Sequence, residues 1–119
     1  MKIVVTTTSA ARTSEIDPRF GRALWFALLD AETGDVTFHD NRSGTKAAQG
    51  AGTQAAERVA ALGADALVTG NIGPNAFEAL RSAGVAVYLT YAGTVDSVVE
   101  RLRAGRLSRA ERPTRRGHS

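Results

Sequence analysis

Short apolar runs alternate along the chain with polar and glycine-rich segments. Consecutive apolar residues are typical of a strand that is buried on both faces of a sheet. In residues 36–39, Val36 and Phe38 instead alternate with polar neighbours, which indicates an edge strand with one face in water. The predicted strands are residues 2–6, 24–29, 36–39, 66–68 and 85–89.

Three further segments have the spacing of helices with one buried face. Residues 53–62 form the first and stop at Gly63; the second begins at Pro74 and its end is marked by Gly84; Thr94 caps the third. The order β-β-β-α-β-α-β-α, with right-handed crossovers, predicts an α/β fold with helices on both faces of the sheet. This is the pattern of a ribonuclease H-like fold with a five-stranded mixed sheet.

The charge is divided unevenly along the 119 residues, which fit one domain. From residue 101 to the end there are seven arginines and one glutamate, whereas residues 1–100 hold eight basic and eleven acidic side chains. We predict a folded domain at residues 1–106 and a basic, disordered tail at residues 107–119. Positive charge in a tail argues against a folded nucleic-acid binder, although an accessory role on nucleic acid stays an alternative.

Several classes of protein are excluded by composition. The chain has no cysteine, so it has neither disulfides nor thiolate ligands for zinc or iron. No apolar run approaches the ~18 residues that span a bilayer, and the apolar start is too short for a signal peptide, so we expect a cytoplasmic protein without a membrane partner. A ribonuclease H-type nuclease needs clustered carboxylates, and residues 2–6 and 66–68 contain none. We therefore expect no enzymatic activity and no catalytic residues.

One edge of the predicted sheet collects the loops that can bind a ligand. Only the second strand is reversed, so four loops leave from the same edge, and three of them lead directly into helices, whose free N–H groups favour anions. Glycines there let a ligand approach the backbone. We predict that three helix starts share one anion pocket. The loops are residues 8–23, 41–52, 69–75 and 91–94. The candidate binding residues are Arg19, Phe20, Gly21, Arg22, Asn41, Gly50, Gly52, Thr69, Gly70, Gly73, Asn75, Gly93 and Thr94.

Several of these residues have a second interpretation. Arg19 and Arg22 can clamp an anion, or they can pair with Asp17 and Glu15. The glycines can serve ordinary turns. His39 at the end of the edge strand is a candidate metal ligand, with a solvated side chain as the alternative. Phe20 lies in the long loop, where it can cover a ligand.

The motifs resemble those of the dinitrogenase iron–molybdenum cofactor biosynthesis family, small proteins related to the NifX-type cofactor carriers. The resemblance extends from Met1 to about Leu107. It rests on Asp-Pro-Arg-Phe-Gly-Arg-Ala at 17–23, Gly-Ala-Gly at 50–52, Thr-Gly-Asn-Ile-Gly-Pro-Asn-Ala-Phe at 69–77, Ala-Gly-Val-Ala-Val-Tyr at 83–88 and Gly-Thr-Val at 93–95.

This resemblance implies a ribonuclease H-like fold without nuclease activity. It also implies a non-enzymatic carrier of an anionic metal–sulfur cluster, of the iron–molybdenum cofactor or iron–sulfur type, with cluster-assembly or acceptor proteins as partners. Because cysteine is absent, such a cluster would be held by His39, by backbone N–H groups or by arginine. The alternative is a small regulatory module that binds a phosphate-bearing metabolite or a protein partner.

Overall fold

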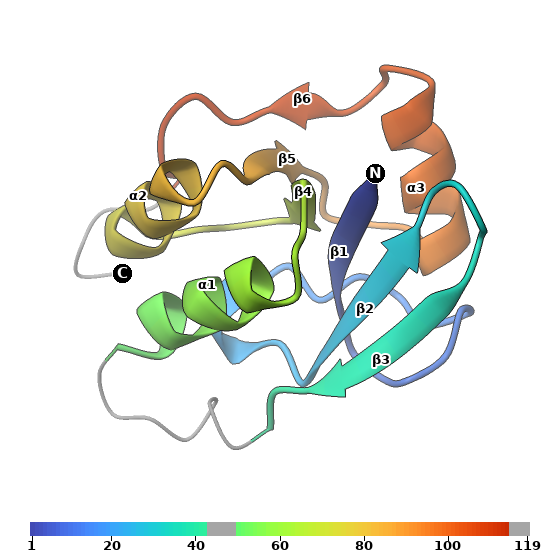
Figure 1. Cartoon of the computed structure of the whole chain (residues 1–119), viewed down its shortest axis with the longest axis horizontal. Coiled ribbons are helices and arrows are strands. Elements are labelled where there is room, and N and C mark those ends of the chain that lie inside the picture. Colours follow the sequence, from blue (N-terminus) through green and yellow to red (C-terminus); the bar gives the residue numbers. More distant parts are fainter. Residues whose placement is uncertain (43–49, 115–119) are drawn as a thin grey trace.

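A twisted sheet forms the centre of the molecule (Figure 1), shown as a computed structural model that describes residues 1–42 and 50–114. Its six strands lie in the order β3-β2-β1-β4-β5-β6. β1 is parallel to β4 and β4 to β5, whereas β2 and β6 are antiparallel to their neighbours. The strands are β1 Lys2–Thr7, β2 Trp25–Asp30, β3 Val36–Asp40, β4 Ala66–Thr69, β5 Ala86–Leu89 and β6 Ser108–Arg109. The predicted strands are confirmed to within one residue at each end, but the sheet has six strands instead of five.

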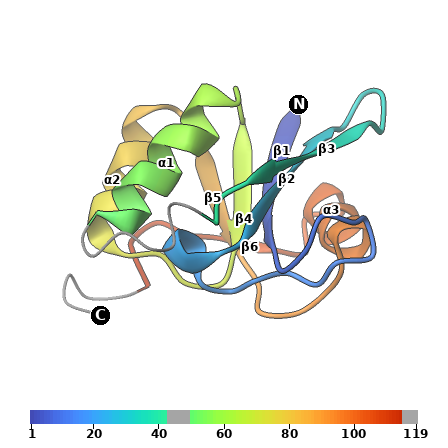
Figure 2. The ribbon, with the colours of Figure 1, turned by 90° about the horizontal axis from the view of Figure 1, so that it is seen from below.

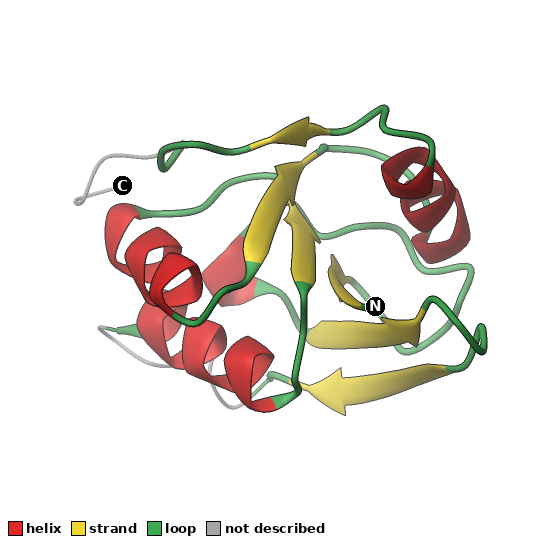
Figure 3. Ribbon diagram, turned by 45° about the horizontal axis from the view of Figure 1, so that its top comes forward, coloured by secondary structure: helices red, strands yellow, loops and turns green. Residues whose placement is uncertain are grey.

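Helices cover both faces of this sheet, as the sequence predicts. α1 (Ala51–Ala61) and α2 (Pro74–Ser82) lie side by side on one face, and α3 (Val95–Arg103) covers the other (Figures 2 and 3). A short 3₁₀ helix, η1 (Phe20–Arg22), was not predicted. Within the described ranges, no helix is long and apolar enough to cross a membrane.

Two apolar clusters join the helices to the sheet, because successive side chains of a strand point to opposite faces. Val4 of β1 and Leu67 of β4 belong to the cluster under α1 and α2. Their neighbours Val5 and Val68 pack with Val98 of α3 in the second cluster. The alternation explains why β1 and β4 are apolar at consecutive positions.

The sixth strand lies in the segment that we predicted to be a disordered tail. Arg109 pairs with Tyr88 of β5. Farther along, the Ala110 N–H donates to the Val87 carbonyl at 2.8 Å, and the Thr114 N–H donates to the Ile72 carbonyl at 3.0 Å. The prediction is therefore wrong for residues 107–114. The backbone of β5 offers unpaired groups at the sheet edge, and a polar segment can pair with them without any hydrophobic repeat. Residues 115–119 lie outside the described part of the chain.

Candidate functional site

The carboxyl ends of four strands meet at one edge of the sheet. β3 runs parallel to β1, because both are antiparallel to β2, and β4 and β5 follow the same direction. At this edge the starts of α1 and α2 lie next to each other. A Cβ atom built on Gly52, the second residue of α1, would lie 3.4 Å from the Cβ atom of Ala76 in the first turn of α2. The close contact of these two small residues brings two helix N-termini together.

Neither of these helix starts has a side-chain cap among the residues that the structure describes. The N-caps are Gly50 and Gly73, which carry no side chain that could accept a hydrogen bond. Gln54 is the first residue of α1 whose N–H reaches back to the Gly50 carbonyl, at 2.9 Å, and Phe77 does the same with Gly73 at 3.0 Å. The amides ahead of them, in residues 51–53 and 75–76, point toward the N-terminal ends. Together with the two helix dipoles, these amides give the edge a positive electrostatic potential.

The long loop before β2 packs directly against these helix starts. A Cβ atom on Gly21 would lie only 2.9 Å from the backbone nitrogen of Gly52. A Cβ atom on Gly70 would lie 2.5 Å from the Cβ atom of Pro18. Gly21 and Gly70 therefore allow backbone segments to contact each other. This corrects our prediction that Gly70 lets a ligand approach the backbone, and the candidate binding residue Gly21 also serves a backbone contact instead.

Hydrogen bonds fix the same loop to the segment that leads into α2. The Asn71 N–H donates to the Pro18 carbonyl at 2.7 Å, and the Phe20 N–H donates to the Asn71 carbonyl at 3.3 Å. The Asn71 side chain also accepts a hydrogen bond from the Tyr91 hydroxyl at 2.8 Å. Asn71 and Tyr91 lie in two of the predicted loops, but neither was among the candidate binding residues.

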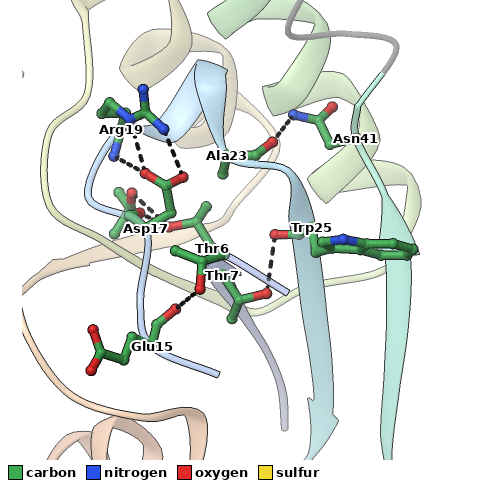
Figure 4. Close-up of polar contacts among 10 residues, drawn as sticks. Thr6, Thr7, Glu15, Asp17, Arg19, Ala23, Trp25 and Asn41 are labelled. Carbon is green, nitrogen blue, oxygen red and sulfur yellow. Dashed lines mark hydrogen bonds and ion pairs between the residues drawn. The ribbon is translucent and has the colours of Figure 1, made fainter. Parts of the chain in front are cut away.

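Arg19 is held in place by a buried carboxylate (Figure 4). Asp17 is 2% exposed, and it accepts hydrogen bonds from the Arg19 backbone N–H at 3.0 Å and from Nε and Nη2 at 3.2 Å each. The hydrogen bond to Asp17, followed by its negative charge, raises the pKa of Arg19. The side chain of Arg19 is nevertheless 61% exposed, so the rest of the guanidinium faces solvent. Arg22, at the end of η1, is also exposed.

Three predicted binding residues have internal roles instead. Phe20 is 2% exposed, and its ring stacks on Phe26 with centroids 6.3 Å apart, so it belongs to the core and does not cover a ligand. Asn41 is buried; its amide donates to the Ala23 carbonyl at 2.8 Å (Figure 4) and its Oδ1 accepts from Arg58. Thr69 is buried and its hydroxyl bonds to Thr6 at 2.9 Å. We remove these residues from the candidate site.

The third helix start does not join the other two. Thr94 and Ser97 form a capping box at the start of α3, and the Val95 N–H donates to the Ser14 carbonyl at 3.2 Å. The Gly93 carbonyl accepts from the Ile16 N–H at 2.9 Å. The predicted pocket of three helix starts is therefore corrected to two. α2 joins the parallel strands β4 and β5 across one face of the sheet, whereas α3 packs on β1 across the opposite face. The N-terminus of α3 therefore lies on the other side of the sheet from the starts of α1 and α2 (Figure 2).

His39 lies on β3, where its Nε2 is 2.9 Å from the hydroxyl of Thr37. In residues 1–42 and 50–114, no group of three or more His, Asp or Glu side chains is arranged to hold a metal ion. The role of His39 as a ligand therefore stays a prediction based on one side chain. Of the predicted loop at 41–52, residues 43–49 lie outside the described residues.

The remaining candidate residues at this edge lie around the two helix starts, at a site that we call the rim. They are Arg19, Arg22, Gly50, Gly52, Gly73 and Asn75. The rim consists of the backbone amides of residues 51–53 and 75–76, with Arg19, Arg22 and the exposed side chain of Asn75 beside them. Backbone donors at helix starts together with guanidinium groups can bind an anion through hydrogen bonds and charge.

Comparison with known proteins places this geometry in a family. The family model described as dinitrogenase iron-molybdenum cofactor matches residues 1–105. The apo form of the orange protein from Desulfovibrio gigas is 38% identical, with a TM-score of 0.92 over 96% of each chain. A Thermotoga protein provisionally described as NifB is 32% identical, with a TM-score of 0.84 over 96% of this chain and 97% of its own. An uncharacterized protein of Methanocaldococcus jannaschii is 26% identical over 100 residues, which cover 82% of this chain and 85% of that protein.

Proposed function

Because the chain belongs to the dinitrogenase iron–molybdenum cofactor family, we propose that it binds an anionic metal–sulfur cluster at the rim and carries it without catalysing a reaction. The description of the Desulfovibrio relative as an apo form supports a carrier, since it implies that the relative also has a loaded form. In this proposal the cluster is cargo, delivered to a cluster-assembly or acceptor protein.

The observation that carries the proposal is the pair of adjacent helix starts without side-chain caps. Where the protein needs only a stable helix start, as in α3, Thr94 and Ser97 supply the cap. At α1 and α2 the N-caps are Gly50 and Gly73, which leave the first amides to another acceptor. Sulfide and oxide groups of an anionic cluster are acceptors of this kind.

Each part of the rim has a role in holding such cargo. The amides of residues 51–53 and 75–76 donate hydrogen bonds to cluster sulfide, and Arg19 and Arg22 offset the negative charge. Asp17 keeps the guanidinium of Arg19 in a fixed position. His39 is the proposed metal ligand, because β3 ends at the same edge of the sheet.

We also keep the ribonuclease H-like assignment as part of the proposal. It is supported by the order β3-β2-β1-β4-β5, in which only β2 is reversed.

The direct test is anaerobic titration with tetrathiomolybdate, a molybdenum–sulfur dianion, followed by desalting, absorbance and metal analysis. Molybdate and inorganic phosphate serve as comparison anions. The proposal expects molybdenum to stay with the protein only when sulfide is present. If the wild-type chain retains no metal, the carrier role is refuted. A thermal shift with phosphate or nucleotides that does not depend on sulfide would favour the metabolite-binding alternative.

A carboxylate placed on the rim separates binding from folding. Asn75 is exposed in the first turn of α2, so Asn75→Asp adds a negative charge where it stabilises the helix by ~0.3–1 kcal/mol. At about 8 Å from a dianion in a water-like dielectric, the same charge opposes binding by about 1 kcal/mol, or about fivefold in Kd. The matched control is Ala61→Glu, which adds one charge at the exposed C-terminal end of α1. Equal affinity of the two variants would show that cargo does not bind at the rim.

A further inference from the structure

The C-terminal segment is the part of the fold that the proposed function does not use. We define residues 106–114 as the strap. We infer that the strap forms a second wall of the rim, with Thr114 as a positioning residue, and that it docks more firmly when anionic cargo is bound. The inference rests on the proposed function and adds a cargo-coupled segment to the site.

The strap runs from the outer edge of the sheet to the start of α2. Leu107 packs against the apolar cluster under α3, and Ser108 and Arg109 then pair with β5. Ala110 follows with its hydrogen bond to Val87 and packs against the cluster under α1 and α2. The red segment in Figures 1 and 2 follows this path beyond β6 toward α2. One segment thus connects both faces of the sheet with the candidate site.

Thr114 ends the strap with a two-sided contact at Ile72. The Ile72 N–H donates to the Thr114 hydroxyl at 2.8 Å, and the Thr114 N–H donates to the Ile72 carbonyl at 3.0 Å. Ile72 directly precedes Gly73, the N-cap of α2. The strap therefore contacts the peptide segment that sets where the first amides of α2 point.

This segment is held from two sides. On one side, Asn71 forms an isolated parallel β-bridge with Arg19, and its carbonyl accepts a hydrogen bond from the Phe20 N–H. On the other side, Ile72 is held by Thr114. Arg19 belongs to the rim. A change in how Thr114 of the strap contacts Ile72 therefore alters the support of a backbone segment that also contacts the rim.

The strap is weakly anchored, which makes its docking sensitive to a ligand. β6 has two residues, and both are exposed. Leu107, Ala110 and Pro113 are partly buried, and no strap residue is fully buried. A segment with few buried contacts opens at low free-energy cost, so a modest difference in interaction shifts its population.

The charge of the strap favours docking in the presence of an anion. Arg106, Arg109 and Arg112 are exposed and outnumber Glu111, the one acid of the strap. Arg112, two residues before Thr114, is the strap cation nearest in sequence to the contact with Ile72, and without cargo we expect its charge to oppose docking beside the positive helix starts. Bound anionic cargo removes this repulsion. By linkage, docking of the strap must then raise the affinity for cargo by the same factor.

The first experiment measures hydrogen exchange of the full-length chain with and without tetrathiomolybdate under anaerobic conditions. We expect the amides of Ala110 and Thr114 to exchange at least threefold more slowly with the dianion, whereas the first-turn amide of Asp96 in α3 does not change. Unchanged exchange at Ala110 and Thr114 in a chain that has retained molybdenum would overturn the inference.

The second experiment measures Kd for tetrathiomolybdate in strap variants. Thr114→Val removes the hydroxyl acceptor at constant shape and is expected to weaken binding about threefold to tenfold, the effect of one hydrogen bond. Thr114→Ser keeps the hydroxyl and is expected to restore wild-type affinity. Ser108→Ala is the matched control, because it removes an exposed hydroxyl from the same strap.

The outcomes separate this inference from the proposed function. If the wild-type chain binds no dianion, the proposed function fails. If the wild-type chain binds and Thr114→Val binds equally tightly, the inference fails and the carrier proposal stands. Weaker binding in both Thr114→Val and Thr114→Ser would also overturn the role of the hydroxyl.

Discussion

The contact of Gly70 with Pro18 gives a sharp test of how the long loop is held on the sheet edge. Gly70→Ala introduces a Cβ atom 2.5 Å from the Pro18 Cβ atom, 2.8 Å from its Cα atom and 3.0 Å from its carbonyl oxygen. Two of these three atoms belong to the backbone, so a change of rotamer cannot relieve the contact. The loop has to move away from the segment at residues 69–73, and the hydrogen bond from the Asn71 N–H to Pro18 is strained.

The cost follows from the effect of overpacking. Insertion of a methyl group into a packed interior typically costs ~1–3 kcal/mol, and replacement of glycine returns ~0.4–1 kcal/mol through the unfolded chain. Because the contact involves backbone atoms, we place the net loss at about 2 kcal/mol. An unfolding entropy of about 2.1 cal/mol/K per residue gives about 0.25 kcal/mol/K for 119 residues, so Tm falls by about 8 °C.

Gly73→Ala is the matched control, three positions along the same segment. A Cβ atom built on Gly73 would meet no atom within 4 Å, and the φ of −79° at this position suits any residue. Alanine is a poorer N-cap than glycine, which lowers the free energy of unfolding. It also reduces the conformational entropy of the unfolded chain, which raises the free energy of unfolding by a similar amount, so Tm should change by less than about 2 °C.

Thermal unfolding followed by circular dichroism, on wild type and both variants at one protein concentration, checks this prediction. A Gly70→Ala variant that unfolds within about 2 °C of wild type would refute the packing argument. So would an equal loss of Tm in both variants, because the effect would then not depend on the contact with Pro18.

The other predictions test the start of α3 and one surface carboxylate. Thr94→Ala removes the capping box and should lower the free energy of unfolding, measured by thermal unfolding, by about 1 kcal/mol. The Kd for tetrathiomolybdate should not change, because α3 starts on the face opposite to α1 and α2. Weaker binding would return Thr94 to the candidate site. Hydrogen bonds from Arg42 hold the pKa of Asp40 below its usual 3.8, so the pair stabilises the fold above about pH 3.8 and loses this contribution as the pH falls further. An NMR titration of Asp40 should show this low midpoint, and Arg42→Gln should raise it; an unmoved midpoint would contradict the pairing.

Most of the architecture follows from local patterns in the sequence. Apolar residues at consecutive positions in β1 and β4 require burial on both faces, and the helical spacings after β3, β4 and β5 supply the helices that provide it. Proline at the first position of α2 and threonine before α3 fixed two helix starts to the residue. These features were predictable because they depend on local periodicity and on the hydrogen-bonding groups of single residues.

β6 and the order of the strap were not predictable in this way. Ser108 and Arg109 have no apolar pattern, and they become a strand only because the edge of β5 lies beside them in the folded chain. The same reason applies to Thr114, whose partner Ile72 is 42 positions away. Pairing of backbone groups leaves little signal in the side chains.

The candidate site was predicted in part, since loops, glycines and arginines were located correctly at one sheet edge. Which of them face solvent depends on the packing of the folded chain. Gly21 and Gly70 turned out to serve backbone contacts, and Asn41 to serve internal hydrogen bonds. Packing also separates α3 from α1 and α2, because a sheet has two faces and the connection from β5 places α3 on the face opposite to the other two helices. Residue types define what a side chain can bind, whereas the packing of distant segments defines which partner it meets.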